Sequence, residues 1–258
     1  MMNPAEYANI AKCEREFWWY RGMEKILFRM LDPIVKARTP ARVVNAVEVG
    51  CGTGYMATRL EQQYPWRMFP TDLQREGLVY GLQYGDGRGA TTRMAQAAIN
   101  ALPFPDGKFD ALVCLDVMVY VPRGEELSAV RELARVIAPG GLLVLRTAAL
   151  EILRSHHAEF TGELQRFTRE QMLKLAAESG IKILRCTYAN SMLMPIALAK
   201  FRLIEPLMRG KPSSGVEPVA PWLDRLLYGA LDAEAAWLGS GHDLPIGQSL
   251  ILIGEKFT

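Results

Sequence analysis

The stretch Val47-Glu48-Val49-Gly50-Cys51-Gly52-Thr53-Gly54 decides the fold, because an apolar strand runs there directly into a glycine-rich turn. Glycine at three alternating positions lets the backbone adopt positive φ and pass close to a ligand that a Cβ atom would displace. The helix expected after the turn presents unpaired N–H groups to an anion or carboxylate. Because the dinucleotide fingerprint G-x-G-x-x-G has its third glycine one residue later, the spacing here favours a nucleoside ligand.

Two further apolar runs, at residues 111–115 and 142–145, predict parallel strands that are covered on both faces. They alternate with helical patterns such as residues 126–137, and this alternation predicts βαβ units and a doubly wound sheet. Ligands of such sheets bind at the carboxyl ends of the strands. Three residues are expected at those ends: Gly50, Asp72 and Asp116.

Four motifs occur in an order that is found in a known family. Residues 48–54 match E/D-x-G-x-G-x-G, and Thr71-Asp72 falls where a second strand should end with an acid. Residues 102–110 resemble LPFPDGxFD, Leu115-Asp116-Val117 resembles the end of the next strand, and residues 131–141 resemble E-hxRVLxPGG. The sequence therefore resembles the class I S-adenosylmethionine (SAM) dependent methyltransferases.

This resemblance implies an α/β fold, with a Rossmann-like doubly wound sheet of about seven strands, an antiparallel last strand and helical insertions. It also implies SAM as the cofactor, with Asp72 bound to the ribose hydroxyls. Two positions depart from the family: Ala98 stands where an acid often binds the adenine amino group, and Val119-Tyr120 replaces a Glu-His pair. The residues that the resemblance assigns to SAM are Glu48, Gly50, Cys51, Gly52, Gly54, Asp72, Leu73, Ala98, Ile99, Leu115, Asp116 and Arg21.

Three other segments resemble a bacterial subfamily of small-molecule methyltransferases. Residues 17–21 resemble the start of fWWyrgrr, residues 155–168 resemble SEHDExxGHxRRYT, and residues 245–249 resemble PxGxS. The middle segment keeps five positions of its pattern: His157, Glu159, Gly162, Arg166 and Thr168. It departs at three others: Ala158, Glu163 and Gln165.

We expect a single methyltransferase domain over residues 1–258. Residues 1–40 form an N-terminal helical lid, and residues 41–187 form the core, with an insertion at 148–167 after the fifth strand. A helical insertion at 188–245 contains a connector at Lys211-Pro212-Ser213-Ser214-Gly215, and the last strand lies within 246–258.

Few residues are obligatory for methyl transfer, since SAM is already activated and the protein supplies alignment and, where needed, a base. His157 is a candidate base or substrate orienter, and the alternative is a hydrogen-bonded loop histidine. Five further residues are candidates for shaping the acceptor pocket: Tyr20, Glu159, Arg166, Tyr188 and Asn190. Trp18 and its neighbour Trp19 fit either a lid over the pocket or a helix packed on the core.

The composition excludes several classes of protein. The formal net charge is +2 and the basic residues are scattered, which argues against a nucleic-acid surface. The four cysteines lack metal-site spacing, and Cys51 is interpreted as structural because no histidine is near it in the sequence. No signal-peptide pattern is evident, so we expect a cytoplasmic protein. Residues 192–199 are far shorter than the ~20 residues of a membrane span.

The leading hypothesis is a SAM-dependent methyltransferase that acts on an oxygen, nitrogen or carbon atom of a small molecule in specialised metabolism. The alternatives are a Rossmann-fold oxidoreductase, which the glycine spacing disfavours, and a non-catalytic SAM-binding or partner-binding subunit. A row of apolar positions fits a homodimer face, a lipid-like acceptor site or a lid helix packed on the core. These positions are Met192, Ile196, Leu198, Phe201, Ile204 and Leu207.

Overall fold

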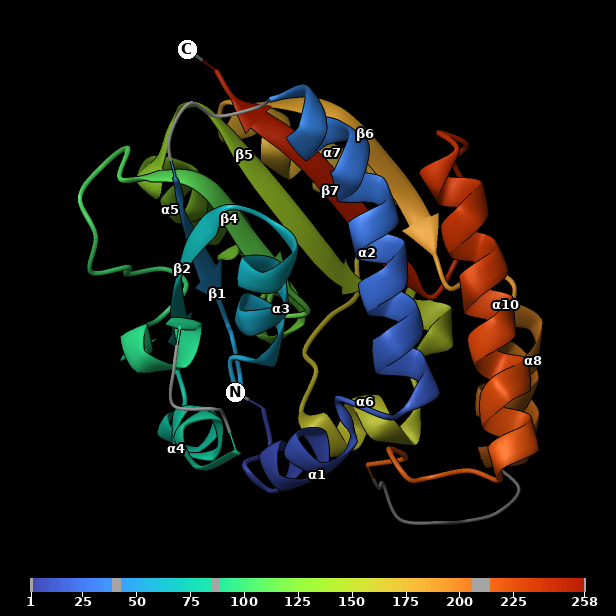
Figure 1. The fold of residues 1–258 in the computed structure, drawn as a ribbon. Helices are drawn as coiled ribbons and strands as arrows, with labels where there is room; N and C mark the ends of the chain where they lie inside the picture. The colour runs from blue at the N-terminus through green and yellow to red at the C-terminus, as the bar shows by residue number, and fades with distance from the viewer. Residues whose placement is uncertain (1, 39–42, 85–88, 206–213, 258) are drawn as a thin grey trace.

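The structure is a computed structural model that describes residues 2–38, 43–84, 89–205 and 214–257 (Figure 1). Three sequence expectations lie outside these ranges. They are the start of the core at Ala41, the apolar position Leu207, and residues Lys211-Pro212-Ser213 of the connector.

The described residues form a seven-stranded sheet in the order β3-β2-β1-β4-β5-β7-β6. Only β7 pairs antiparallel to its neighbours, so the prediction of a doubly wound sheet with an antiparallel last strand is confirmed. In Figure 1 the arrows of β5 and β6 point toward α6, and the arrow of β7 points the opposite way. The strands are β1 (Val44–Val49), β2 (Trp66–Asp72), β3 (Ala95–Gln96), β4 (Phe109–Leu115), β5 (Ile137–Ala148), β6 (Ile181–Ala189) and β7 (Ser249–Lys256).

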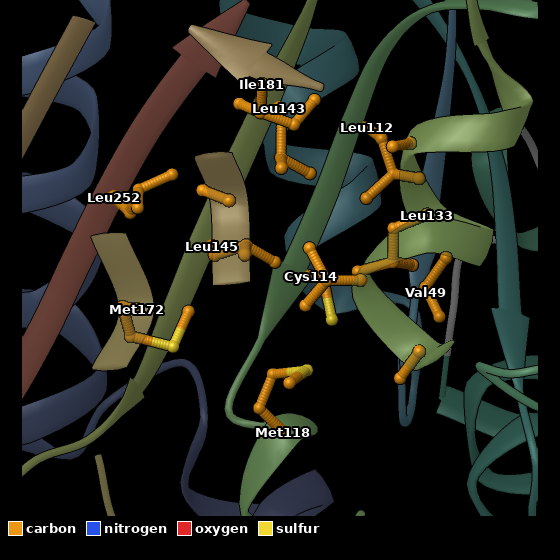
Figure 2. Packing of buried hydrophobic residues seen from close by; sticks show 14 of the residues in the cluster. Val49, Leu112, Cys114, Met118, Leu133, Leu143, Leu145, Met172, Ile181 and Leu252 are labelled. Atoms are coloured by element: carbon orange, nitrogen blue, oxygen red, sulfur yellow. The ribbon is translucent and has the colours of Figure 1, made fainter. Parts of the chain in front are cut away.

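Helices pack on both faces of the sheet, as the unbroken apolar strands require. Because successive side chains of a strand point to opposite faces, Val113 packs toward α2, α3 and α10, whereas Leu112 and Cys114 pack toward α5 and α7. Figure 2 shows the second of these cores, where Leu133 of α5 and Met172 of α7 meet the strands. These helices are α2 (Trp18–Ala37), α3 (Tyr55–Gln63), α5 (Glu126–Val136), α7 (Arg169–Glu178) and α10 (Pro221–Gly239).

Shorter elements complete the described chain, and several of them lie at the carboxyl edge of the sheet. They are α1 (Ala5–Cys13), α4 (Arg75–Tyr84), η1 (Gly89–Arg93), η2 (Met118–Tyr120), η3 (Glu151–Leu153), α6 (His156–Thr161), α8 (Met194–Ala199) and η4 (Lys200–Ile204). Figure 1 shows α1 and α6 below the strands, and the backbone of Asn3 donates to the carbonyl of Thr161 at 3.1 Å.

Local sequence explains where several elements begin and end. The Thr168 side chain accepts from the Gln171 N–H in a capping box, which fixes the start of α7. The N-terminal helical segment predicted for residues 1–40 contains two helices, because Phe17 has an extended backbone (ψ 132°) and separates α1 from α2. This break turns α1 away from α2 and makes both available at the same edge of the sheet.

Among the helices of the described ranges, none is long and apolar enough to cross a membrane.

Candidate active site

A cavity of about 940 Å³ follows the carboxyl edge of the sheet. Its floor is formed by the ends of β1, β2, β4 and β5, by Asn190 after β6 and by Ser249 at the start of β7. The helices α1 and α6 and the start of α2 lie around it. The volume is near the upper end of the range of about 300–1,000 Å³ that is usual for small-molecule sites. The cavity is therefore large enough to be divided between a cofactor and an acceptor.

Most of the residues predicted from the sequence are brought together in the lining. They are Tyr20, Glu48, Gly50, Cys51, Gly52, Asp72, Leu73, Ala98, Ile99, Leu115, Asp116, His157, Arg166 and Asn190. Tyr188, which is buried on β6, does not line the cavity.

Three other predicted residues do not line the cavity. Gly54 is the N-cap of α3, and Glu159 is exposed on α6. Arg21 lies on the side of α2 that faces α10, where its guanidinium forms an ion pair of 2.5 Å with Asp224 and lies 4.6 Å from the centre of the Tyr228 ring. Because Asp224 holds this guanidinium, Arg21 is directed away from the cavity.

The glycine turn is fixed to the end of β2 by backbone hydrogen bonds. The amides of Gly50 and Cys51 donate to the Thr71 carbonyl at 2.7 and 2.9 Å. Gly50 has a φ of +77°, and a Cβ atom there would lie 2.0 Å from Cγ2 of Val117. Burial raises the pKa of the Cys51 thiol well above its usual value, so this residue stays protonated and is no nucleophile.

Asp72, at the end of β2, is buried and held by three hydrogen bonds. Its carboxylate accepts from the Gly52 and Gln74 amides, both at 2.8 Å, and from the Tyr7 hydroxyl at 3.1 Å. Burial raises the pKa of this carboxyl. Since an ionised carboxylate offers about four lone-pair sites, Asp72 keeps capacity for a hydroxyl of a ligand.

The burial and hydrogen bonding of Glu48 show whether SAM fits this end of the cavity. The residue is 2% exposed, and its Oε2 atom has no hydrogen-bond partner among the described residues. Burial raises the pKa of the Glu48 carboxyl to about 8. A buried acceptor without a partner is costly unless a ligand supplies a donor. The ammonium group of SAM is such a donor, so the residues present fit this cofactor.

An ion pair lies between the two ends of the cavity. Asp116 follows β4 with a φ of +60°, and its carboxylate accepts from the Arg146 guanidinium at 2.6 and 3.0 Å. The guanidinium lies 5.2 Å from the Trp19 ring centre. Trp18 and Trp19 both line the cavity and pack against the core, so they combine the two roles that the sequence left open.

The far end of the cavity is covered by segments that are distant in sequence. His157 Nδ1 contacts the Ser214 carbonyl, and the Ser214 hydroxyl donates to Glu6 at 2.9 Å. Because a carbonyl only accepts, His157 Nδ1 carries a proton, and Nε2 of the neutral ring is left as an acceptor. We call α1, α6 and residues 214–216 the roof. Arg166, below it, forms an ion pair of 3.1 Å with Glu163.

Several residues of the lining were not predicted from the sequence. Tyr7 binds Asp72, and Glu14 accepts from the Thr53 hydroxyl at 2.5 Å. Burial raises the pKa of Glu14 to about 7. Helical spacing does not reveal which side of α1 covers a cavity, so neither residue gave a signal. Arg146 did give one, because it is a charged residue directly after the apolar run at 142–145.

No group of three or more histidine, cysteine, aspartate or glutamate side chains in the described ranges could hold a metal ion.

Comparisons with known proteins agree with this geometry. Residues 46–141 match a family described as a methyltransferase domain. The malonyl-[acyl-carrier protein] O-methyltransferase 1 of Coxiella burnetii is 28% identical over 142 residues, which cover 54% of this chain and 43% of the relative. The demethylmenaquinone methyltransferase of Thermus thermophilus is 32% identical over 109 residues, which cover 42% of this chain and 47% of the relative. The chain thus spans less than half the length of these relatives.

A solved structure gives the same fold. The geranyl diphosphate C-methyltransferase of Streptomyces coelicolor superposes with a TM-score of 0.56 at 14% identity, covering 87% of this chain and 77% of that protein. The sheet order, the glycine turn and the matched domain identify a Rossmann-like methyltransferase fold. Residues 46–141 are thus a class I SAM-dependent methyltransferase domain, and SAM is the cofactor of that family.

Proposed function

We propose that the protein transfers the methyl group of SAM to an oxygen, nitrogen or carbon atom of a small-molecule acceptor. One observation carries this proposal: a continuous cavity has the glycine turn, Asp72 and the unpartnered Glu48 oxygen at one end and the roof at the other. The first end suits a nucleoside that bears an ammonium group. The second end leaves space for a different molecule beside it.

Each residue of the cavity lining has a separate role in this proposal. Asp72 accepts from the ribose hydroxyls, Glu48 accepts from the ammonium group, and the backbone at Ala98 and Ile99 borders the adenine. SAM supplies a methyl group that is already activated for in-line displacement. The chain therefore has to orient the acceptor and exclude water, and the aromatic side chains of Trp19 and Tyr20 do this from α2.

His157 is the proton acceptor in this scheme. Its Nδ1 is committed to the Ser214 carbonyl, so Nε2 is free to take a proton from an acceptor in the cavity. The roles of Glu159 and Arg166 are narrower. Arg166 holds Glu163 at the lining, whereas Glu159 on the outer side of α6 has no part in the reaction.

Calorimetric titration with S-adenosylhomocysteine, with NADH as the control ligand, tests the cofactor. We expect binding of S-adenosylhomocysteine with a dissociation constant of the order of micromolar and no binding of NADH. Absence of S-adenosylhomocysteine binding, or binding of NADH, would contradict the proposal. Transfer of a tritiated methyl group from SAM then tests catalysis. Cofactor binding without transfer to any acceptor would favour the non-catalytic subunit instead.

The cytoplasmic location, the role in specialised metabolism and the homodimer remain predictions from the sequence.

A further inference from the structure

The helix α10 has an exposed apolar face on the outside of the molecule, beside α2 (Figure 1). Six exposed residues recur there at helical spacing, and we call them the outer face of α10: Trp222, Leu226, Gly229, Ala233, Ala236 and Trp237. Trp222, Leu226 and Trp237 are 67%, 63% and 49% exposed. Because a surface helix normally presents polar residues to solvent, a continuous apolar face indicates a binding surface.

The charged residues of α10 indicate what kind of partner fits this face. Asp224 and Asp232 form ion pairs with α2, and Glu234 is fully buried. Only Arg225, the fourth charged residue of the helix, is exposed beside the outer face. Helices that lie on membranes are rich in lysine and arginine, whereas α10 carries three acids and one arginine. An apolar protein surface is therefore a better match than a bilayer.

Gly229, in the middle of the outer face, has no close neighbour among the described residues. A Cβ atom there would have nothing within 4 Å, although glycine inside a helix is destabilising relative to alanine. Gly22 of α2 shows what such a glycine permits, since its Cβ would lie 2.3 Å from the side chain of Leu231, on the opposite side of α10. Gly229 would allow the same close approach by a second helix.

The order of residue sizes along the outer face is symmetric. Two crossing helices approach most closely in the middle and diverge toward their ends, so small residues suit the middle and large residues suit the ends. Gly229 and Ala233 lie in the middle, and Trp222 and Trp237 lie at the two ends. A twofold axis near Gly229 would place Trp222 opposite Trp237 of the partner subunit, and Leu226 opposite Ala233 of the partner subunit.

The area of the outer face is close to what a stable pair needs. A tryptophan side chain presents up to about 250 Å², so the exposed parts of Trp222 and Trp237 amount to roughly 300 Å² per copy. Leu226 and the small residues bring the face toward the ~500 Å² per copy of a minimal specific interface. Tryptophan is also enriched among the residues that contribute most to binding.

We propose that the outer face of α10 binds the same face of a second copy of the chain, with the two helices antiparallel about a twofold axis near Gly229. This inference goes beyond the proposed function and does not depend on it. The interface also differs from the apolar row at 192–207 that the sequence offered as a homodimer face, because the described part of that row lies mainly on α8 and η4.

Sedimentation equilibrium between about 1 and 100 μM tests the pairing. We expect twice the mass of the chain, with a dissociation constant of the order of micromolar or tighter. Gly229→Glu brings two like charges together at the axis and should weaken the pair about a hundredfold or more. The variant should keep the helical circular dichroism of the parent, because nothing in the described chain lies near this position. Ala177→Glu, at an exposed position of α7, adds the same charge elsewhere and should leave the pair intact.

Three results would overturn the inference. The parent could remain a monomer at about 100 μM, or Gly229→Glu could pair as tightly as the parent. The parent could also float with vesicles of phosphatidylcholine and phosphatidylglycerol while Gly229→Glu does not, which would show that the outer face binds a bilayer.

Cysteine pairing tests the antiparallel arrangement. Leu226 and Ala233 lie opposite each other across the proposed axis, whereas two copies of either residue are separated by seven residues, about 10 Å along the helices. Because a disulfide requires Cα atoms within about 7 Å, an equal mixture of Leu226→Cys and Ala233→Cys should form a linked dimer on oxidation, and neither variant alone should do so. The parent, with its own free Cys13, is the control. Linkage of either variant alone, or none in the mixture, would contradict this arrangement.

Discussion

The two ends of the cavity are built from different kinds of contact. At the β1–β2 end the Gly52 amide binds Asp72, only 20 residues further along the chain. At the roof the Ser214 hydroxyl binds Glu6 across 208 residues, and Asn3 binds Phe160 across 157. The first end is made by backbone and one acid, whereas the second is assembled from side chains of separate segments. A change in α6 or in residues 214–216 should therefore alter acceptor binding and leave cofactor binding intact, whereas α1 also contacts the cofactor end because Tyr7 donates to Asp72.

The largest effect is expected from Gly50→Ala, which breaks the β1–β2 end. The new Cβ would meet Val117 at 2.0 Å and sit on a backbone with φ +77°. We expect loss of S-adenosylhomocysteine binding by about a hundredfold or more and a decrease of about 3 kcal/mol in the free energy of unfolding. Calorimetry and urea denaturation measure the two effects.

Gly180→Ala is the matched control for this glycine. Gly180 has a φ of +73°, but nothing lies within 4 Å of the position that its Cβ would take. This variant should therefore lose only about 1 kcal/mol of stability and keep cofactor affinity. Equal losses of affinity in both variants would show that backbone strain, and not the close approach at Gly50, determines binding.

Glu234→Gln should disrupt the hydrogen bonds that hold Asn190 at the other end of the cavity. The Glu234 carboxylate is fully buried on α10 and accepts from the amides of Asn190, Ser191 at 2.8 Å and Met192 at 3.0 Å. An amide in its place turns an N–H group toward at least one of these donors. We expect a loss of about 2 kcal/mol in stability, with S-adenosylhomocysteine affinity within about twofold of the parent.

The control for Glu234 lies on the same helix. Asp232 forms an exposed ion pair with Lys25, with its side chain 44% exposed, so Asp232→Asn should cost less than about 1 kcal/mol. Should Glu234→Gln weaken S-adenosylhomocysteine binding about tenfold or more, the two ends would not be independent.

The pH dependence of the free energy of unfolding tests the burial of Glu48 at the β1–β2 end. Burial raises the pKa of the folded Glu48 carboxyl from 4.5 to about 8, so the folded chain binds a proton that the unfolded chain has released between these values. Stability from this group is therefore fully present below about pH 4.5 and is lost as the pH rises to 8. We expect the free energy of unfolding to fall over this window.

Glu48→Gln, which cannot ionise, should flatten this dependence and weaken S-adenosylhomocysteine binding about tenfold. Some dependence should remain, because burial also raises the pKa of Glu14 to about 7. Urea denaturation of the ligand-free protein at pH 5.5, 7 and 8.5 measures the slope. An unchanged slope in Glu48→Gln would mean that this carboxyl ionises normally in the fold.

The smallest effect is expected from Arg21→Ala. The side chain is 35% exposed and pairs with Asp224, which is 24% exposed, so the loss of stability should be about 1 kcal/mol or less. S-adenosylhomocysteine affinity should not change, because the guanidinium points toward α10. A clear loss of S-adenosylhomocysteine affinity in calorimetry would show instead that Arg21 contacts the cofactor, as the sequence predicted.

The β1–β2 end was largely predictable because its determinants are local. A glycine turn after an apolar strand and an acid after the next strand are visible as residue types at fixed spacing, and the structure brings Gly50 and Asp72 to one cavity. The doubly wound sheet with an antiparallel last strand was predicted from the resemblance that the same motifs carry. The end of the core was less predictable, since β6 continues to Ala189, past the predicted core boundary at residue 187.

The roof was only partly predictable, because its residues meet through long-range contacts. His157 was a candidate from its motif, but nothing in the sequence pairs it with Ser214. Glu6 and Glu14 belong to the segment that was predicted as an N-terminal helical lid over residues 1–40. The extended backbone at Phe17 redirects α1 over the cavity, and helical periodicity does not reveal such a bend.

Calorimetric titration of S-adenosylhomocysteine into the parent protein, Asp72→Ala and His157→Ala tests most directly whether the cavity is divided into a cofactor end and an acceptor end. We predict that Asp72→Ala weakens binding about tenfold or more, because the ribose hydroxyls lose their acceptor, and that His157→Ala binds within about twofold of the parent. Parent-like binding by Asp72→Ala, or an equal loss in His157→Ala, would contradict this division.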